Sequence, residues 1–181
     1  MTLPRPQDVI AFWREAGPDR WFSKDAAFDE ACRARFLDAH EAAARGDLEE
    51  WELSPDGALA LVLLLDQLPR NMFRGDRRAW RTDPVALMAA DRAIERGYDG
   101  RVDPELRRFF YLPLMHSEAM HHQERSVALN EPLGEEAARY ARLHLDLIAR
   151  FGRFPHRNAV LGRESTPEEE VYLAQDDAFR G

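Results

Sequence analysis

The strongest constraint on the fold is a run of eight apolar residues, Ala58–Leu65, which follows a helix-start signal. In the preceding Ser54-Pro55-Asp56, serine is a favoured N-cap, proline suits the first helical position, and an acid suits the first turn. A helix that is apolar on every side is buried in a protein core. The run is much shorter than the roughly 20 residues of a membrane-spanning helix. The sequence therefore predicts a buried central helix, which Pro69 ends or kinks.

Helical periodicity extends over almost the whole chain, and no stretch shows the sustained alternation of a β-strand. Gly46 and Gly152 mark helix ends, and Leu48–Trp51 reads as a helical turn. The other expected helices are Gln7–Ala16, Asp25–Arg45, Thr82–Gly97, one that starts at Asp103 and holds Pro113 in its interior, Gly134–Phe151, and one opened by the capping box Thr166–Glu169. This pattern predicts an all-α fold of about seven helices in a single domain, residues 1–181, with one long non-helical polar loop, Gly152–Ser165.

Composition limits the kinds of partner that the protein is expected to bind and the cellular compartment in which it is expected. The net charge of −8 argues against bulk electrostatic binding to nucleic acid or to anionic membranes. A local charge of +4 over residues 70–81, with Phe73 and Trp80 interleaved, makes RNA contact a minor alternative only. Cys32 is the only cysteine, so neither an intramolecular disulfide nor a cysteine metal cluster is expected. Without an apolar leader segment, we expect a cytoplasmic protein with no membrane partner.

Arginine supplies 24 of the 25 Lys and Arg residues. A GC-rich genome accounts for most of this bias. A subset of the arginines is expected to make bidentate contacts to carboxylate or phosphate, which lysine makes poorly.

The first place where local rules are broken is residues 65–75. Asp66 lies near the C-terminal end of the most buried helix, where the helix dipole disfavours an anion. It needs a compensating partner, and Arg70, one turn further on, is the natural candidate if the helix continues past a kink. The pair is interpreted either as part of a site or as an internal ion pair that fixes the following turn.

The second place is Phe109–Glu118, where a proline in an expected helix precedes three polar residues. The spacing of His116, Met120 and Gln123 predicts that they share one helix face. That face either lines a pocket or holds a core histidine bonded to a free carbonyl.

The third place is Phe151–Thr166, which carries Arg153, His156, Arg157 and Arg163 between glycines. It is interpreted either as an anion-binding loop or as a loop whose arginines bind the six acids of residues 164–177.

Metal and nucleophile motifs are poorly supported. Glu118-Ala119-Met120-His121 matches one Glu-x-x-His element of di-iron bundles, but the chain holds no second copy. No His-Glu-x-x-His, Gly-x-Ser-x-Gly or phosphate-loop sequence is present. Neither a metal nor a cofactor is expected.

The same three blocks resemble a bacterial family, the domain-of-unknown-function family numbered nine hundred and twenty-four. The resemblance covers nearly the whole chain in order and spacing. It implies helical hairpins stacked in a tetratricopeptide-like right-handed superhelix, and it implies no catalytic residues. The family usually has Phe where this chain has Leu68, and His121 and His122 lie outside its pattern. The family motif maps onto Asp66, Gln67, Arg70, Asn71, Arg74, His116, Ser117, Glu118, Gln123, His144, Arg153, His156, Arg157, Asn158 and Arg163.

The favoured functional hypothesis is a polar pocket, formed where the three blocks converge, that binds a small carboxylate or phosphate. Arg70, Arg153 and Arg157 would hold the anion, and His116 or His156 would exchange protons if chemistry occurs. The remaining predicted ligand-binding residues are Asp66, Asn71, Arg74, Glu118, Gln123, His144, Asn158 and Arg163. Two alternatives stay open: a peptide-binding groove, and motif residues that serve only the structure.

Overall fold

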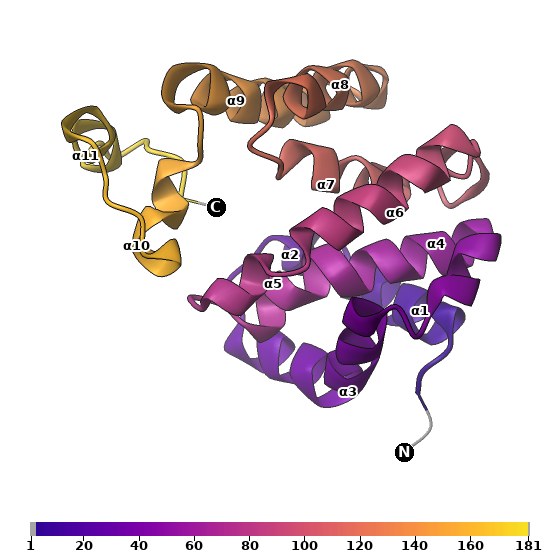
Figure 1. Cartoon of the computed structure of the whole chain (residues 1–181). Helices are drawn as coiled ribbons and strands as arrows, with labels where there is room; N and C mark the ends of the chain where they lie inside the picture. The colour runs from indigo at the N-terminus through magenta and orange to yellow at the C-terminus, as the bar shows by residue number, and fades with distance from the viewer. Residues whose placement is uncertain (1–2, 181) are drawn as a thin grey trace. The chain divides into compact units, whose positions relative to one another are not determined.

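The computed structural model describes residues 3–180, which contain helices and turns and no β-strand (Figure 1). The all-α prediction is confirmed. The chain forms two compact units, Met1–Pro113 and Leu114–Gly181. The tetratricopeptide-like superhelix and the single domain over residues 1–181 stay predictions.

The described part of the first unit is built from four longer helices, two short ones, and connecting 3-10 turns. Its α-helices are α1 Pro6–Ala16, α2 Pro18–Trp21, α3 Ala26–Arg45, α4 Pro55–Val62, α5 Leu68–Met72 and α6 Asp83–Glu95. Its 3-10 turns are Glu49–Leu53, Arg77–Trp80, Asp99–Arg101 and Arg107–Phe110. Helix α7, Leu112–Met115, spans the boundary between the two units.

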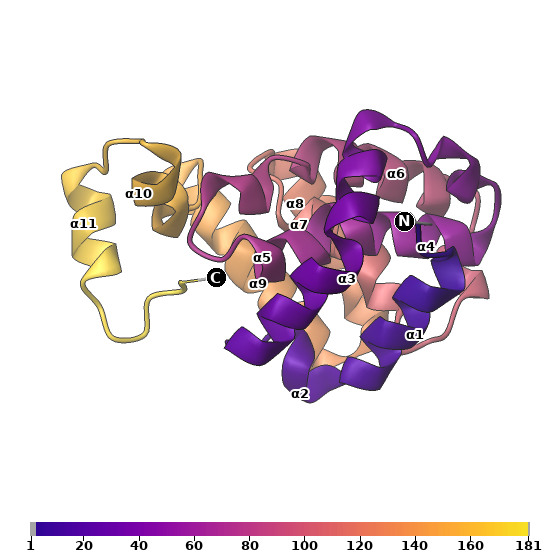
Figure 2. The same ribbon diagram turned by 90° about the horizontal axis from the view of Figure 1, so that it is seen from below.

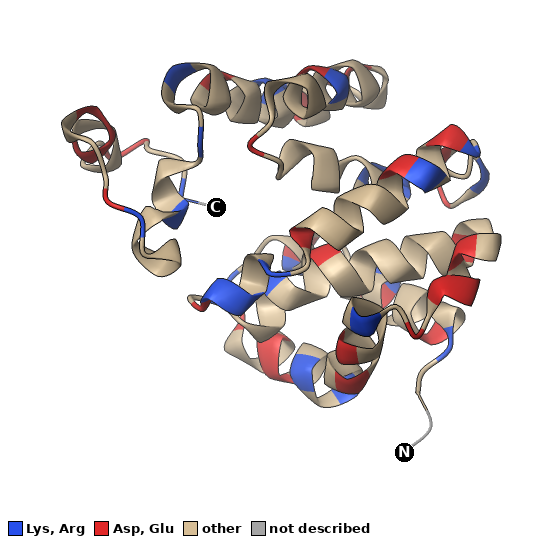
Figure 3. Ribbon diagram, in the orientation of Figure 1, with Lys and Arg blue, Asp and Glu red and all other residues tan. Residues whose placement is uncertain are grey.

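The central helix α4 forms as the sequence predicts. The Ser54 hydroxyl accepts a hydrogen bond from the backbone N–H of Gly57, so Ser54 caps the helix. Gly57 is required because a Cβ there would lie 2.1 Å from the Trp51 carbonyl oxygen. Helix α4 packs between α1 and α6, and apart from its first turn its ribbon carries no charge (Figures 1 and 3). Its buried side chains form the centre of the first unit.

The chain does not leave the helix at Pro69. A π-helical turn, Leu63–Gln67, joins α4 to α5, and α3 packs against this continuation (Figure 2). Proline has no N–H, so the Leu65 carbonyl loses its usual α-helical donor. Side chains bind three successive carbonyls instead: His40 Nδ1 binds that of Leu64 at 2.9 Å, the Thr82 hydroxyl binds that of Leu65 at 2.6 Å, and Arg70 binds that of Asp66. Thr82 was expected to cap α6 with its side chain, and the hydroxyl is used here instead.

The expected long helix from Asp103 is wrong. A 3-10 turn, the short helix α7 and a non-helical turn at residues 116–119 replace it. Pro113 is the second residue of α7, where a missing N–H costs nothing. Gln123 Nε2 donates to the carbonyls of Leu114, Met115 and Ser117 and so stabilises the break. His116, Met120 and Gln123 therefore do not share one face of a continuous helix.

The second unit contains two longer helices, α8 Met120–Asn130 and α9 Glu135–Phe151, which pack against each other (Figure 1). Gly152 ends α9 with φ +67°, as predicted. The segment Gly152–Ser165, expected to be non-helical, contains a 3-10 turn, Pro155–Arg157, and the short helix α10, Asn158–Leu161. Helix α11, Pro167–Leu173, begins with the predicted capping box at Thr166 and Glu169. Phe154 and Tyr172 bury this segment against Leu147 and Ile148 of α9.

Candidate functional site

The first motif block lies in the first unit, where its charged side chains pair with carboxylates. Asp66 is fully buried, and Arg70 lies 3.3 Å from it and 3.0 Å from Asp83. The predicted pairing of Asp66 with Arg70 is confirmed. Asn71 and Arg74 both donate to Asp29 of α3, at 2.9 and 2.7 Å. These contacts join α5 to α3 and α6, so the block secures the helical continuation past Pro69.

The second and third blocks meet in the second unit. The Glu118 carboxylate accepts hydrogen bonds from the backbone N–H of Phe154 and from Arg163, both at 2.8 Å. Arg157 donates to the His116 carbonyl at 3.0 Å, and its guanidinium lies 4.4 Å from the centre of the Phe154 ring. Residues of the second and third blocks are thus brought together in this unit, while the convergence of all three blocks on one cavity stays a prediction.

Glu169, which was not among the predicted site residues, accepts hydrogen bonds from several parts of the segment Gly152–Thr166. Its carboxylate is 1% exposed and accepts hydrogen bonds from Arg153 at 2.6 and 2.7 Å. Asn158 and the backbone N–H of Thr166 also donate to it. The hydrogen bonds from Arg153 lower the pKa of Glu169 to about 2. Arg153 therefore binds an acid further along the chain, which is the structural alternative that the sequence left open.

The remaining predicted residues of this unit hold the loop or pack beneath it. Asn158 also donates to the Ser165 hydroxyl at 3.1 Å and accepts from Arg163 at 2.9 Å. His144 is buried on α9, with its Nδ1 2.8 Å from the Tyr140 carbonyl oxygen.

Aromatic side chains surround two histidines of this unit. The His144 and His156 rings both lie against Phe154 and Phe179, with centres 4.7 to 5.7 Å apart. His156 Nδ1 is buried and has no hydrogen-bond partner among residues 3–180. Burial, and then the positive charge of Arg157, lowers the pKa of His156 to about 3. His156 is therefore neutral near pH 7.

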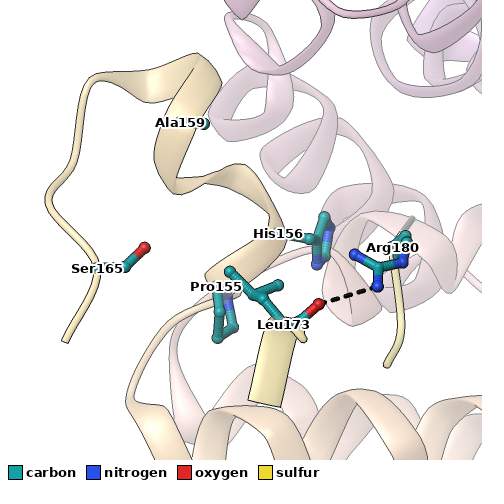
Figure 4. A pocket seen from close by; sticks show the side chains of 6 residues that line it. All are labelled: Pro155, His156, Ala159, Ser165, Leu173 and Arg180. Carbon is teal, nitrogen blue, oxygen red and sulfur yellow. Dashed lines mark hydrogen bonds between the residues drawn. The ribbon is translucent and has the colours of Figure 1, made fainter. Parts of the chain in front are cut away.

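A cavity of about 310 Å³ opens beside His156 (Figure 4). The Arg180 guanidinium faces it and donates to the backbone carbonyls of Leu173 and Gln175, at 2.9 and 3.2 Å. Among residues 3–180, no carboxylate lies within ion-pair distance of Arg180. The cavity is lined by Pro155, His156, Ala159, Ser165, Leu173 and Arg180.

Of the predicted site residues, only His156 lines this cavity. Sequence reasoning missed Arg180 because it belongs to no motif and follows a strongly acidic segment. Ser165 stands inside the third block, but a lone serine before a capping box gives no sign of a ligand. The fold brings these residues together through the return of the chain after α11.

The fold and its cavity define an all-helical protein with a small, partly polar site in its C-terminal unit. The chain belongs to the family described as bacterial protein of unknown function (DUF924), whose model matches residues 9–177. It is similar to a solved structure of a protein of unknown function from Agrobacterium tumefaciens, with 53% sequence identity and a TM-score of 0.91, covering 93% of this chain and 96% of that one. No curated protein matches the chain.

The described part of the chain contains neither a membrane-crossing helix nor a cluster of metal-binding side chains. Within residues 3–180, no helix combines the length and the apolar character that crossing a lipid bilayer requires. The same residues contain no group of three or more His, Cys, Asp or Glu side chains placed to hold a metal ion. Cys32 is buried, and burial raises the pKa of its thiol to about 12, which makes it an unreactive core residue.

Proposed function

We propose that the C-terminal unit binds a small anionic molecule in the cavity beside His156, with Arg180 as the cation that holds it. The observation that carries the proposal is the bonding of Arg180. Its guanidinium lines the cavity, and its partners are two backbone carbonyls rather than an acid. A guanidinium whose charge is not cancelled by a carboxylate is a favourable partner for a ligand anion.

The contrast with the neighbouring arginines supports this assignment. Arg153 is bound by Glu169, Arg163 by Glu118, and Arg150 by Glu168. An anion that recruited Arg153 would have to compete with the Glu169 carboxylate, which already accepts two hydrogen bonds from this guanidinium. We therefore propose that Arg153 and Arg163 stabilise the loop and that Arg180 contacts the ligand. Arg157, the third arginine of the loop, lies over Phe154 and binds a backbone carbonyl.

The surroundings of His156 also favour an anion. After burial, the largest cause that lowers its pKa is the charge of Arg157, and Arg163 acts in the same direction. Both guanidiniums are permanently charged, so they add positive potential at the ring although the whole chain carries −8. A cavity with such a lining concentrates anions.

The same pKa argues against proton exchange by His156 as the main role of the site. A general base works best with a pKa close to the operating pH, and a value of about 3 makes His156 a weak proton acceptor near pH 7. The proposal is therefore a binding function, with no catalytic step assigned to His156 or His116.

The proposal is tested by thermal unfolding in the presence of acetate, trifluoroacetate, inorganic phosphate and sulfate, each compared at equal ionic strength. An anion at 100 times its dissociation constant stabilises the folded state by about 2.7 kcal/mol. We expect Arg180→Ala to abolish that stabilisation.

The matched control is Arg142→Ala, because Arg142 lies on α9 in the same unit, pairs with Glu131 and does not line the cavity. We expect this variant to keep the response to anions. If no anion stabilises the wild-type protein, or if both variants respond like the wild type, the proposal is wrong. Either result would favour the two competing hypotheses, a peptide-binding groove or motif residues that serve only the structure.

A further inference from the structure

The imidazole of His156 faces the same cavity as Arg180, and its contacts are unusual for a partly buried histidine (Figure 4). The ring lies against Phe154 on one side and Phe179 on another. Its Nδ1 has no hydrogen-bond partner in the described chain. Because Nδ1 makes no hydrogen bond in the described chain, a change in the protonation of the ring breaks no existing contact at this atom.

The charged and titratable groups around His156 come from several parts of the second unit. Arg157 follows it in the 3-10 turn, Arg163 comes from the segment after α10, His144 from α9, and His116 from the turn before α8. Arg180 comes from the segment after α11.

An anion placed in the cavity would change this balance. It would place a negative charge beside His156, and an opposite charge within about 4–6 Å favours the protonated imidazole. Binding equilibria are reciprocal, so a proton on His156 strengthens anion binding by the same factor by which the anion strengthens proton binding.

The lining also indicates the chemical class of the ligand. One guanidinium, one imidazole and the Ser165 hydroxyl form the polar part, while Pro155, Ala159 and Leu173 supply carbon surface. A single permanent cation matches a monoanion better than a phosphate dianion, and the carbon surface suits a short hydrocarbon body.

We infer that this cavity takes up a small monocarboxylate together with a proton on His156, so that the net species bound is a carboxylic acid. The inference rests on the proposed function, because it needs Arg180 to hold the anion. The carboxylate arrives ionised, the proton comes from solvent, and no covalent bond forms or breaks.

The test is an NMR titration of the histidine side chains of the wild-type protein from pH 7.5 downward, with and without saturating trifluoroacetate. Trifluoroacetate is chosen because it stays ionised over the whole range. We expect the pKa of His156 to rise from about 3 by about two to three pH units when the probe is bound, since a smaller rise would leave the ring neutral at pH 5. His121 is exposed on α8 and serves as the internal control, with no change expected.

A second measurement follows trifluoroacetate affinity by ¹⁹F NMR between pH 7 and pH 5 in the wild type and in His156→Asn. We expect the wild-type affinity to increase as pH falls and the variant to bind with no such dependence. Sulfate, which stays a dianion over this range, should displace the probe poorly when added in competition.

The two claims fail in different ways. If trifluoroacetate does not bind to the wild type at all, the proposed function fails. If it binds and the pKa of His156 stays unchanged, or if sulfate displaces it readily, anion binding stands and the inference of proton-coupled carboxylate uptake is overturned.

Discussion

The two units use the same residue types for different ends. In Met1–Pro113, the motif acids and arginines neutralise one another around the helical turn at Asp66. In Leu114–Gly181, the acids Glu118 and Glu169 neutralise Arg163 and Arg153, while Arg180 is left facing a cavity. The comparison teaches that most arginines of the motif pair with acids and hold the fold together. An arginine that no acid of the described chain neutralises is the better candidate for a ligand contact.

The largest effect should come from Glu169→Ala in the second unit. The substitution removes a 1% exposed carboxylate and leaves Arg153, Asn158 and the Thr166 N–H without their acceptor. We expect a loss of about 3–5 kcal/mol in the free energy of unfolding, measured by urea denaturation. Glu168→Ala is the control, because its pair with Arg150 is exposed and worth less than about 1 kcal/mol. Similar losses for the two variants would contradict the role given to Glu169.

The corresponding change in the first unit is Arg70→Ala, which leaves the fully buried Asp66 without its cation. We expect a loss of about 3 kcal/mol, somewhat less than for Glu169, because Gln67 still donates to Asp66. Adding Asp66→Asn should recover part of the loss. Hydrogen exchange should place the early opening within residues 1–113, and opening confined to residues 114–180 would break the distinction between the units. Arg78→Ala, which removes an exposed pair with Asp76, is the control.

Acid should weaken the second unit through His156. The folded-state pKa is about 3, below the ordinary value of 6.5, so the unfolded chain binds more protons between these two values. Stability therefore falls as pH decreases from about 6.5 to about 3, and at pH 5 the cost is at most about 2 kcal/mol. His156→Asn should flatten this part of the stability curve, measured by urea denaturation at several pH values. An unchanged slope in the variant would mean that His156 titrates normally in the folded protein.

The smallest effect is expected from Thr82→Val, which removes the hydroxyl bound to the Leu65 carbonyl. The loss should be about 1–3 kcal/mol, near the lower end, because a single neutral hydrogen bond is removed and the side-chain volume is kept. Thr166→Val is a useful comparison, since that hydroxyl caps α11 in the other unit. If Thr82→Val has no effect on thermal unfolding, the carbonyl freed by Pro69 is satisfied without Thr82.

Local signals in the sequence predicted most helix ends. Ser54, Gly152 and Thr166 each act through their own backbone neighbourhood, so their roles follow from adjacent residues. Pro69 and Pro113 were harder to interpret, because proline at a helix start and proline inside a helix look alike in sequence. Distant side chains decide between the two: Thr82 supports the helix at Pro69, and Gln123 stabilises the break after Pro113.

The candidate site was only partly predictable for the same reason. The third block drew attention to His156, which lines the cavity, and its arginines were candidates for a ligand because their carboxylate partners could not be assigned from spacing alone. Glu169 lies sixteen residues from Arg153, and Glu118 lies 45 residues from Arg163. Arg180 belongs to no motif, and it is a candidate because no acid among residues 3–180 pairs with it, which only the folded chain reveals.

The central claim is that Arg180, rather than the arginines of the motif, contacts the anion. The most direct test follows the side-chain Nε–H resonances of the arginines by ¹⁵N NMR while trifluoroacetate is added. The account predicts that the Arg180 resonance shifts and saturates, while those of Arg153 and Arg163 stay with their carboxylate partners. Saturating shifts at Arg153 and Arg163 with none at Arg180 would contradict it and would return the anion to the motif arginines.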